Sequence, residues 1–200
     1  MTTSPLARRL LLVALVMLMP VLPAAANPVT ITRSTLHYDI AGATAPDIAD
    51  SIHRNMPDAT EGFVGSTAYM YRWTYKYRAA ADASGTSGCA VHDVRVTIAI
   101  TTRMPRHSTI RAAPDAVRAL WENYAIALKR HEDHHADDFV EIGSRLPAAI
   151  AAVITPDCAT IEAAANRIGM EFVARAQDDA DDYDAATHHG VDEGASFPGL

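Results

Sequence analysis

The pattern of hydrophobic positions changes once along this chain, near residue 110, from a period of two to a period of three to four. In the first part, apolar or aromatic residues alternate with polar ones, as is typical of half-buried strands. Such stretches occupy residues 28–38, 69–79 and 91–101. The last two flank a Gly- and Ser-rich turn, so we expect them to form a hairpin.

Two further signals refine this N-terminal part. A short helix is expected over residues 44–56, because Thr44 or Ala45 can cap it and Pro46 stands in its first turn. Pro105 is expected to end the last strand. The strand at residues 69–79 carries a tyrosine or tryptophan at alternate positions, which favours an aromatic face on the core over a substrate-binding face.

From Pro114 onward, the apolar positions recur at helical spacing. Pro114 and Asp115 supply a start signal, and Pro147 predicts a break or kink. A last helix is expected over residues 159–180, and the polar tail from Asp181 is expected to be extended over the surface except where a site holds it. The pattern therefore predicts an α+β fold, with an N-terminal antiparallel sheet and a short helix followed by C-terminal helices.

Composition fits a single folded domain over residues 27–200. Hydrophobic residues make up 49% of the chain and charged residues 20%, so a core can form. The formal net charge is -7 and no basic stripe occurs, which argues against nucleic acid as a partner. The sequence gives no oligomeric state.

Residues 1–26 have the features of a secretory signal peptide. Arg8 and Arg9 precede an apolar run at residues 10–21, and the small residues of 24–26 offer a cleavage site. The run is too short to span a bilayer comfortably, so cleavage is favoured over a membrane anchor. Loss of the leader changes the charge to -7 - 2 = -9. We expect an exported protein, periplasmic or secreted, without stable membrane insertion.

Two cysteines, Cys89 and Cys158, lie in the expected mature chain. An even number of cysteines in an exported protein favours one disulfide, which would close a loop of about 70 residues. The alternative is a pair of metal-bound thiolates. Zinc sites built from cysteine usually contain closely spaced pairs, and these two residues are far apart.

The strongest chemical signal is the sequence His131-Glu132-x-x-His135 within the helical region. Residues four apart share a helix face, so both imidazoles can reach one zinc ion. Glu132 lies beside the metal, where its carboxylate can take a proton from water and pass it to a leaving amine. The alternative is a polar, solvent-facing run. His134 is expected to be exposed or to lie next to the metal-binding histidines without binding the metal. Asp138 either accepts a hydrogen bond from the other ring nitrogen of a ligand histidine or is solvated.

A catalytic zinc site needs a third protein ligand and one open position. The downstream chain offers His189, His188 and Asp184 as ligands, and Tyr183 as a group that could stabilise an oxyanion. The residue types alone leave these candidates open.

The chain resembles a family of exported bacterial proteins that is catalogued as a domain of unknown function and described as predicted secreted zinc-dependent proteases. The shared features are spread over the mature chain: Tyr38-Asp39, Trp73-x-Tyr75, Cys89, Met104-Pro105, Trp121, Tyr124, His131-Glu132-x-x-His135, Cys158, Tyr183-Asp184-x-x-Thr187-x-His189-Gly190 and Gly194-Ala195.

This resemblance implies a zincin-like metallopeptidase fold. It also implies that the segment from Tyr183 to Gly190 belongs to the site, with His189 as the preferred third ligand and Asp184 as the runner-up. His188 directly precedes His189 in this chain, so either histidine could serve.

Three functions are compatible with these features. The first is an exported peptidase that hydrolyses peptide or protein substrates with one Zn²⁺ ion per chain. The second is a non-catalytic zinc-binding envelope or interaction module, and the third is a zinc amidase acting on cell-wall peptides. Glu132 favours an enzyme, because a structural zinc site needs no neighbouring base.

Overall fold

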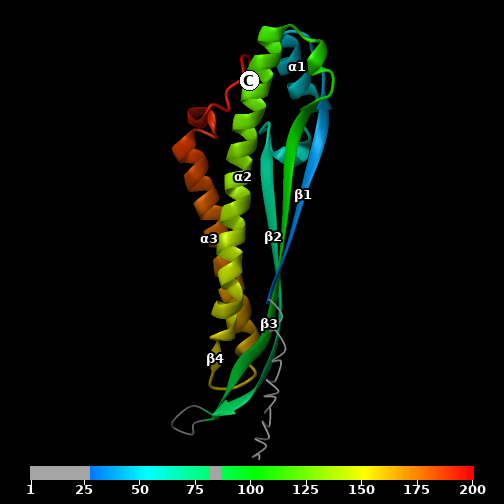
Figure 1. The fold of residues 1–200 in the computed structure, drawn as a ribbon. Helices are drawn as coiled ribbons and strands as arrows, with labels where there is room; N and C mark the ends of the chain where they lie inside the picture. The colour runs from blue at the N-terminus through cyan, green and yellow to red at the C-terminus, as the bar shows by residue number, and fades with distance from the viewer. Residues whose placement is uncertain (1–27, 82–86) are drawn as a thin grey trace, which may run out of the picture.

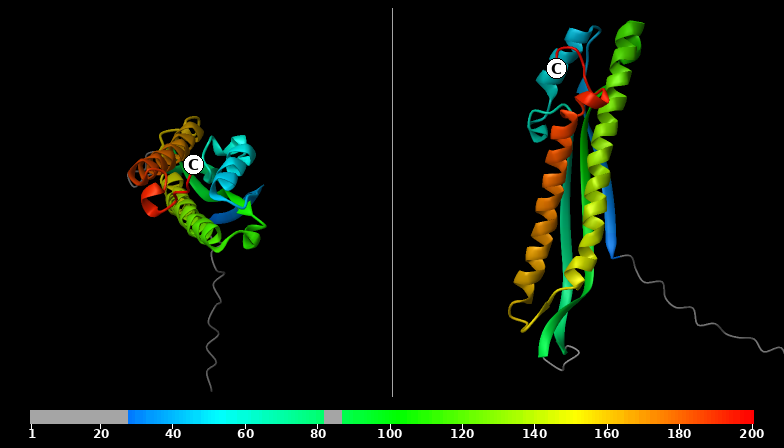
Figure 2. Two further views of the ribbon diagram at one scale, coloured as in Figure 1. Left: turned by 90° about the horizontal axis from the view of Figure 1, so that it is seen from above. Right: turned by 90° about the vertical axis from the view of Figure 1, so that its left-hand side faces the viewer.

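A computed structural model describes residues 28–81 and 87–200, and the expected signal peptide lies outside the described residues. The fold is α+β, and two long helices run side by side along one face of a mixed sheet (Figures 1 and 2). In chain order the elements are β1 (Val29–Ile40), α1 (Ala45–Asn55), η1 (Asp58–Thr60), β2 (Ser66–Ala81), β3 (Ser87–His107), η2 (Ile110–Ala112), α2 (Asp115–Ala151), β4 (Ile154–Thr155), α3 (Ile161–Thr187) and η3 (Val191–Glu193).

The sheet has the strand order β1-β3-β2, and the short β4 also pairs with β3. β2 and β3 form the expected antiparallel hairpin, but β1 runs parallel to β3, so the prediction of an antiparallel sheet is wrong. A parallel pair needs a longer connection than a hairpin turn. Here α1 and β2 both lie between the two parallel strands in the chain.

β3 continues past the proline that was expected to end it. Pro105 pairs with Tyr38 of β1, and β3 ends at His107. The pairing of β2 with β3 begins at Arg103, so beyond this residue β3 has one neighbouring strand instead of two. A proline without an amide donor is tolerated where one side of a strand is unpaired.

The alternating aromatic residues of β2 lie against the two long helices, as expected for a core-facing row. Tyr71 donates a hydrogen bond of 2.6 Å to the carbonyl of Phe139 in α2. Tyr69 donates to the carbonyl of Val173 in α3, and its ring packs against Phe139. This row therefore anchors both helices, because each phenol buried there needs an acceptor.

α1 and α2 begin where the sequence predicts. The Thr44 hydroxyl caps α1 by accepting a hydrogen bond from the amide of Asp47. α2 does not break at Pro147 but continues to Ala151. The proline costs one backbone hydrogen bond, and the fully buried Leu146 and Ile150 on either side hold this turn against the core.

α3 is longer than predicted and ends at Thr187, so residues 181–187 are helical and not an extended tail. The chain then turns back toward α2, and Phe197 is buried beside Trp121 and Tyr124. The last part of the chain thus packs as core and holds the end of α3 in place.

The predicted disulfide between Cys89 and Cys158 is confirmed. It joins the start of β3 to the segment before α3, at the end of the sheet where β4 lies (Figure 1). Within residues 28–81 and 87–200, no helix combines the length and apolar character needed to cross a membrane.

Candidate metal centre

The helix α2 carries the His-Glu-x-x-His sequence on its buried face. His131 and Glu132 are each 3% exposed and His135 is 7% exposed. Leu128 precedes them and Phe139 follows them on the same side of the helix, both buried. These apolar side chains flank the two imidazoles along the buried face of the helix.

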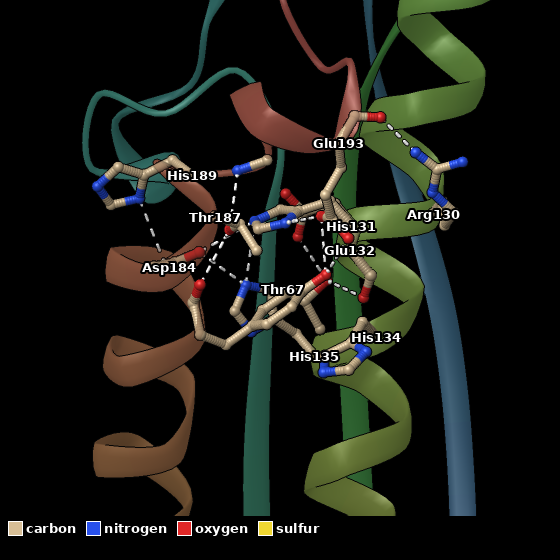
Figure 3. A network of polar contacts seen from close by, with 12 residues as sticks. Thr67, Arg130, His131, Glu132, His134, His135, Asp184, Thr187, His189 and Glu193 are labelled. Atoms are coloured by element: carbon tan, nitrogen blue, oxygen red, sulfur yellow. Dashed lines mark hydrogen bonds and ion pairs between the residues drawn. The ribbon is translucent and has the colours of Figure 1, made fainter.

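Asp184 in the last turn of α3 meets both histidines (Figure 3). Its Oδ1 atom lies 3.0 Å from Nε2 of His131 and 3.0 Å from Nε2 of His135, and the two Nε2 atoms are 3.3 Å apart. Zinc–nitrogen bonds of roughly 2.0–2.1 Å at tetrahedral angles separate neighbouring ligand atoms by about 3.3 Å. The three side chains therefore fit one face of a tetrahedral metal ion and could hold it.

The charges at this site favour the ionised aspartate. Burial alone would raise the pKa of Asp184, but hydrogen bonds and charges from His131 and His135 outweigh it and hold this pKa well below its usual range. Burial alone would lower the pKa of His131, yet its carboxylate partners raise this pKa. A carboxylate kept ionised between two imidazoles is a suitable set of donors for a divalent cation.

The other ring nitrogen of His131 is held by a residue that the sequence analysis did not identify. Nδ1 of His131 lies 3.0 Å from the Glu193 carboxylate. Tyr183 donates its hydroxyl to the same carboxylate at 2.8 Å, and Arg130 donates to the Glu193 carbonyl. A carboxylate on the far nitrogen fixes the tautomer and the orientation of a ligand histidine. Glu193 directly precedes Gly194-Ala195, but its distance from the motif in the sequence gave no signal of this contact.

Glu132 lies within the site without belonging to the group of three. Its carboxylate accepts a hydrogen bond of 2.8 Å from the Thr67 hydroxyl on β2. Burial raises the pKa of Glu132, although the bond from Thr67 and the nearby histidines oppose the shift. Gly65 precedes β2, and a Cβ atom there would lie 2.6 Å from a Glu132 carboxylate oxygen. Glycine thus leaves room for the acid at the edge of the sheet.

Three successive residues after α3 have left-handed backbone angles. The φ values are 49° for His188, 52° for His189 and 80° for Gly190. A Cβ atom on Gly190 would lie 2.9 Å from Cγ of His131, so only glycine fits against the imidazole. This turn ends the helix and leads the chain back toward Glu193 and His131.

His189, the preferred third ligand from the resemblance, is not part of the group that converges with His131 and His135. Its Nδ1 lies 3.6 Å from Asp184, its side chain is 54% exposed, and its ring packs against Phe63. His188 points elsewhere and pairs with Asp192 at 2.7 Å. The runner-up, Asp184, occupies the position expected for the third ligand.

The remaining candidates surround the centre. Asp138 pairs with His134 at 3.1 Å instead of with either buried histidine. The Tyr183 ring stacks on His134 and on His131, and its hydroxyl is engaged by Glu193. Tyr183 therefore lies against the site from one side, and its hydroxyl is hydrogen-bonded to Glu193.

The centre opens into a cleft of about 470 Å³. One wall is the start of β2 with the loop before it, and the opposite wall is the last part of α3. β2 is at the end of the strand order, so its outer edge pairs with no strand in the described residues. The cleft thus combines a candidate metal centre, a buried acid and an unpaired strand edge.

Comparison with known proteins gives a family but no function. Residues 35–190 match the family described as "bacterial protein of unknown function (DUF922)". No curated protein and no solved structure matches the chain. The match includes the two helices that bring His131, His135 and Asp184 together. The chain therefore belongs to the DUF922 family of bacterial proteins of unknown function.

Proposed function

We propose that this protein is an exported zinc-dependent peptidase with a zincin-like site. His131, His135 and Asp184 would hold the metal, and Glu132 would act as the base. The observation that carries the proposal is the position of Glu132: a buried carboxylate, hydrogen-bonded to Thr67, directly follows one member of the His–His–Asp group in the same cleft.

Each protein group has a distinct task in this proposal. A bound zinc ion would polarise a peptide carbonyl and lower the pKa of a water molecule. Glu132 takes the proton of the attacking water and delivers it to the nitrogen of the leaving amine. Thr67 holds the Glu132 carboxylate in place, and Glu193 holds the His131 ring.

The outer edge of β2 supports a peptide as substrate. This edge pairs with no strand in the described residues, and the start of β2 lines the cleft together with Glu132, so an extended chain could pair with it as an added strand. This mode of binding would lay a peptide bond across the mouth of the site. Export is supported by the disulfide between Cys89 and Cys158, because such bonds persist in oxidising compartments.

The test uses the purified mature chain with measured zinc content and a quenched casein substrate. We expect one zinc ion per chain, and we expect Glu132→Gln to retain it while turnover falls by at least about 100-fold. Asp133→Asn is the matched control, because Asp133 is exposed and pairs with Lys129 on the helix surface. This variant should keep full activity.

The alternative functions predict other results. Zinc binding without any turnover that depends on Glu132 would indicate a binding module. Cleavage of cell-wall peptide fragments but not of casein would indicate an amidase. Loss of zinc in both variants would contradict the assigned roles, because Asp133 does not face the site.

A further inference from the structure

The cleft has a one-sided charge. Its lining includes the carboxylates of Glu61, Glu132, Asp181 and Asp184, and no lysine or arginine among the described residues. A divalent cation would balance Asp184 and Glu132. Glu61 and Asp181 would remain uncompensated, and neither forms an ion pair in the part of the chain that the structure describes. A cleft lined by one sign of charge attracts ligands of the opposite sign.

Asp181 lies on the wall of the cleft that α3 forms. It lies on α3 three residues before Asp184, and residues at this spacing share a helix face about 5–6 Å apart. Its carboxylate accepts a hydrogen bond of 2.7 Å from the Gln177 amide, which keeps it at the cleft wall. Asp181 and Tyr69 of β2 line the same cleft.

The start of β2, on the other wall of the cleft, determines which side chains of a bound peptide would face Asp181. A chain added to the edge of β2 directs alternate side chains toward the face that the helices cover. Side chains on that face are two residues, or about 7 Å, apart. The spacing between Asp181 and Asp184 on α3 is close to the spacing of alternate side chains along a strand. If Asp184 holds the metal at the peptide bond that is cleaved, Asp181 would face a substrate side chain next to that bond.

We infer that the cleft selects extended peptides that carry a lysine or arginine within two residues of the cleaved bond, with Asp181 as the partner of that cation. The inference rests on the proposed peptidase function and names its substrate class. Glu61, on the loop before β2, adds attraction for the cationic peptide without a fixed contact.

The test compares quenched peptides that differ only by Lys, Gln or Glu at one position, scanned over two residues on each side of the cleaved bond. We expect kcat/KM for the best Lys peptide to exceed that of its Glu counterpart by about tenfold, and added salt to reduce the ratio. Asp181→Asn should lower the ratio to about threefold or less. Asp182→Asn is the matched control, because Asp182 is exposed on the same helix and does not line the cleft.

A binding measurement separates this inference from the proposed activity. Fluorescence anisotropy of the labelled Lys and Glu peptides is followed with zinc-loaded Glu132→Gln protein, which needs no turnover. Tighter binding of the Lys peptide that is weakened by Asp181→Asn supports the inference, even if no peptide is cleaved. Equal binding of both peptides, or a preference that Asp182→Asn removes as strongly as Asp181→Asn, overturns it.

Discussion

At the scale of single residues, Asp184 and not the expected His189 joins His131 and His135 in the group that could hold a metal ion. Asp184 Oδ1 is 3.0 Å from both imidazoles, whereas His189 reaches only the outer side of Asp184. We therefore predict that Asp184→Ala lowers zinc affinity by more than about 100-fold and His189→Ala by less than about tenfold. Competition titration with a zinc-binding dye measures both values. The opposite order would restore His189 as the ligand.

Glu193 gives a second prediction at this scale. Its carboxylate orients the His131 ring, and loss of such an outer partner typically costs 10–100-fold in metal affinity. Glu193→Gln should weaken zinc binding by about this factor in the same titration. Asp192→Asn, which removes a neighbouring charge that pairs with the exposed His188, should have no effect. Equal effects of the two variants would indicate a general charge effect and would contradict an orienting role.

The sequence identified part of this site for a clear physical reason. His131, Glu132 and His135 are fixed relative to one another by a single helical turn, so their spacing was sufficient. Asp184 and Glu193 reach the site through a tertiary contact between α2 and the end of α3. The left-handed turn at His188 and His189, which directs His189 outward, has no sequence signal because non-glycine residues seldom adopt it.

At the scale of elements, the disulfide lies at one end of the two long helices, and the candidate metal centre lies away from it. The bond between Cys89 and Cys158 joins β3 to the segment before α3, while the candidate ligands lie midway along α2 and at the end of α3 (Figure 1). Loss of the disulfide should therefore lower the stability of the fold without changing the affinity for zinc.

Replacement of both cysteines by serine tests this separation. We predict a loss of about 2–5 kcal/mol in the free energy of unfolding and a decrease of about 10 °C in Tm, because the unfolded chain is no longer constrained. Zinc affinity of the folded variant should stay within about threefold of the wild type. Calorimetry and the zinc titration measure the two effects. A variant that folds but loses zinc would show that the disulfide also sets the site.

The sequence predicted the positions of the strands and of α1, but not the parallel pairing of β1 or the helical end of α3. Alternation located the strands, and capping located α1, because both depend on local residue types. The parallel pairing of β1 with β3 depends on which edge of the hairpin β1 joins, and no local pattern encodes that choice. The helical end of α3 is polar, and its packing against α2 through Tyr183 overrides the composition that suggested an extended tail.

At the scale of the whole molecule, buried tyrosines link stability to high pH. Burial raises the pKa of Tyr38, Tyr71 and Tyr124 above the value of a free phenol, about 10. The folded protein thus holds these protons more tightly than the unfolded chain. This contribution to stability is complete below about pH 10 and is lost as the pH rises above it.

We predict that the three phenols ionise together with unfolding when the pH is raised from about 8 to about 12. Ultraviolet absorbance of tyrosinate and far-ultraviolet circular dichroism should change in one transition. Exposed Tyr77 should titrate separately from that transition. Ionisation of all tyrosines near pH 10, with no change in circular dichroism, would contradict the burial of these phenols.

We propose that two histidines of α2 and the aspartate of α3 bind one zinc ion. An anomalous-difference map, measured at the zinc absorption edge from crystals of the zinc-loaded protein, tests it most directly. We predict one peak per chain, bonded to Nε2 of His131, Nε2 of His135 and Oδ1 of Asp184. A map without a peak there, or with His189 in the place of Asp184, would contradict this assignment of the ligands.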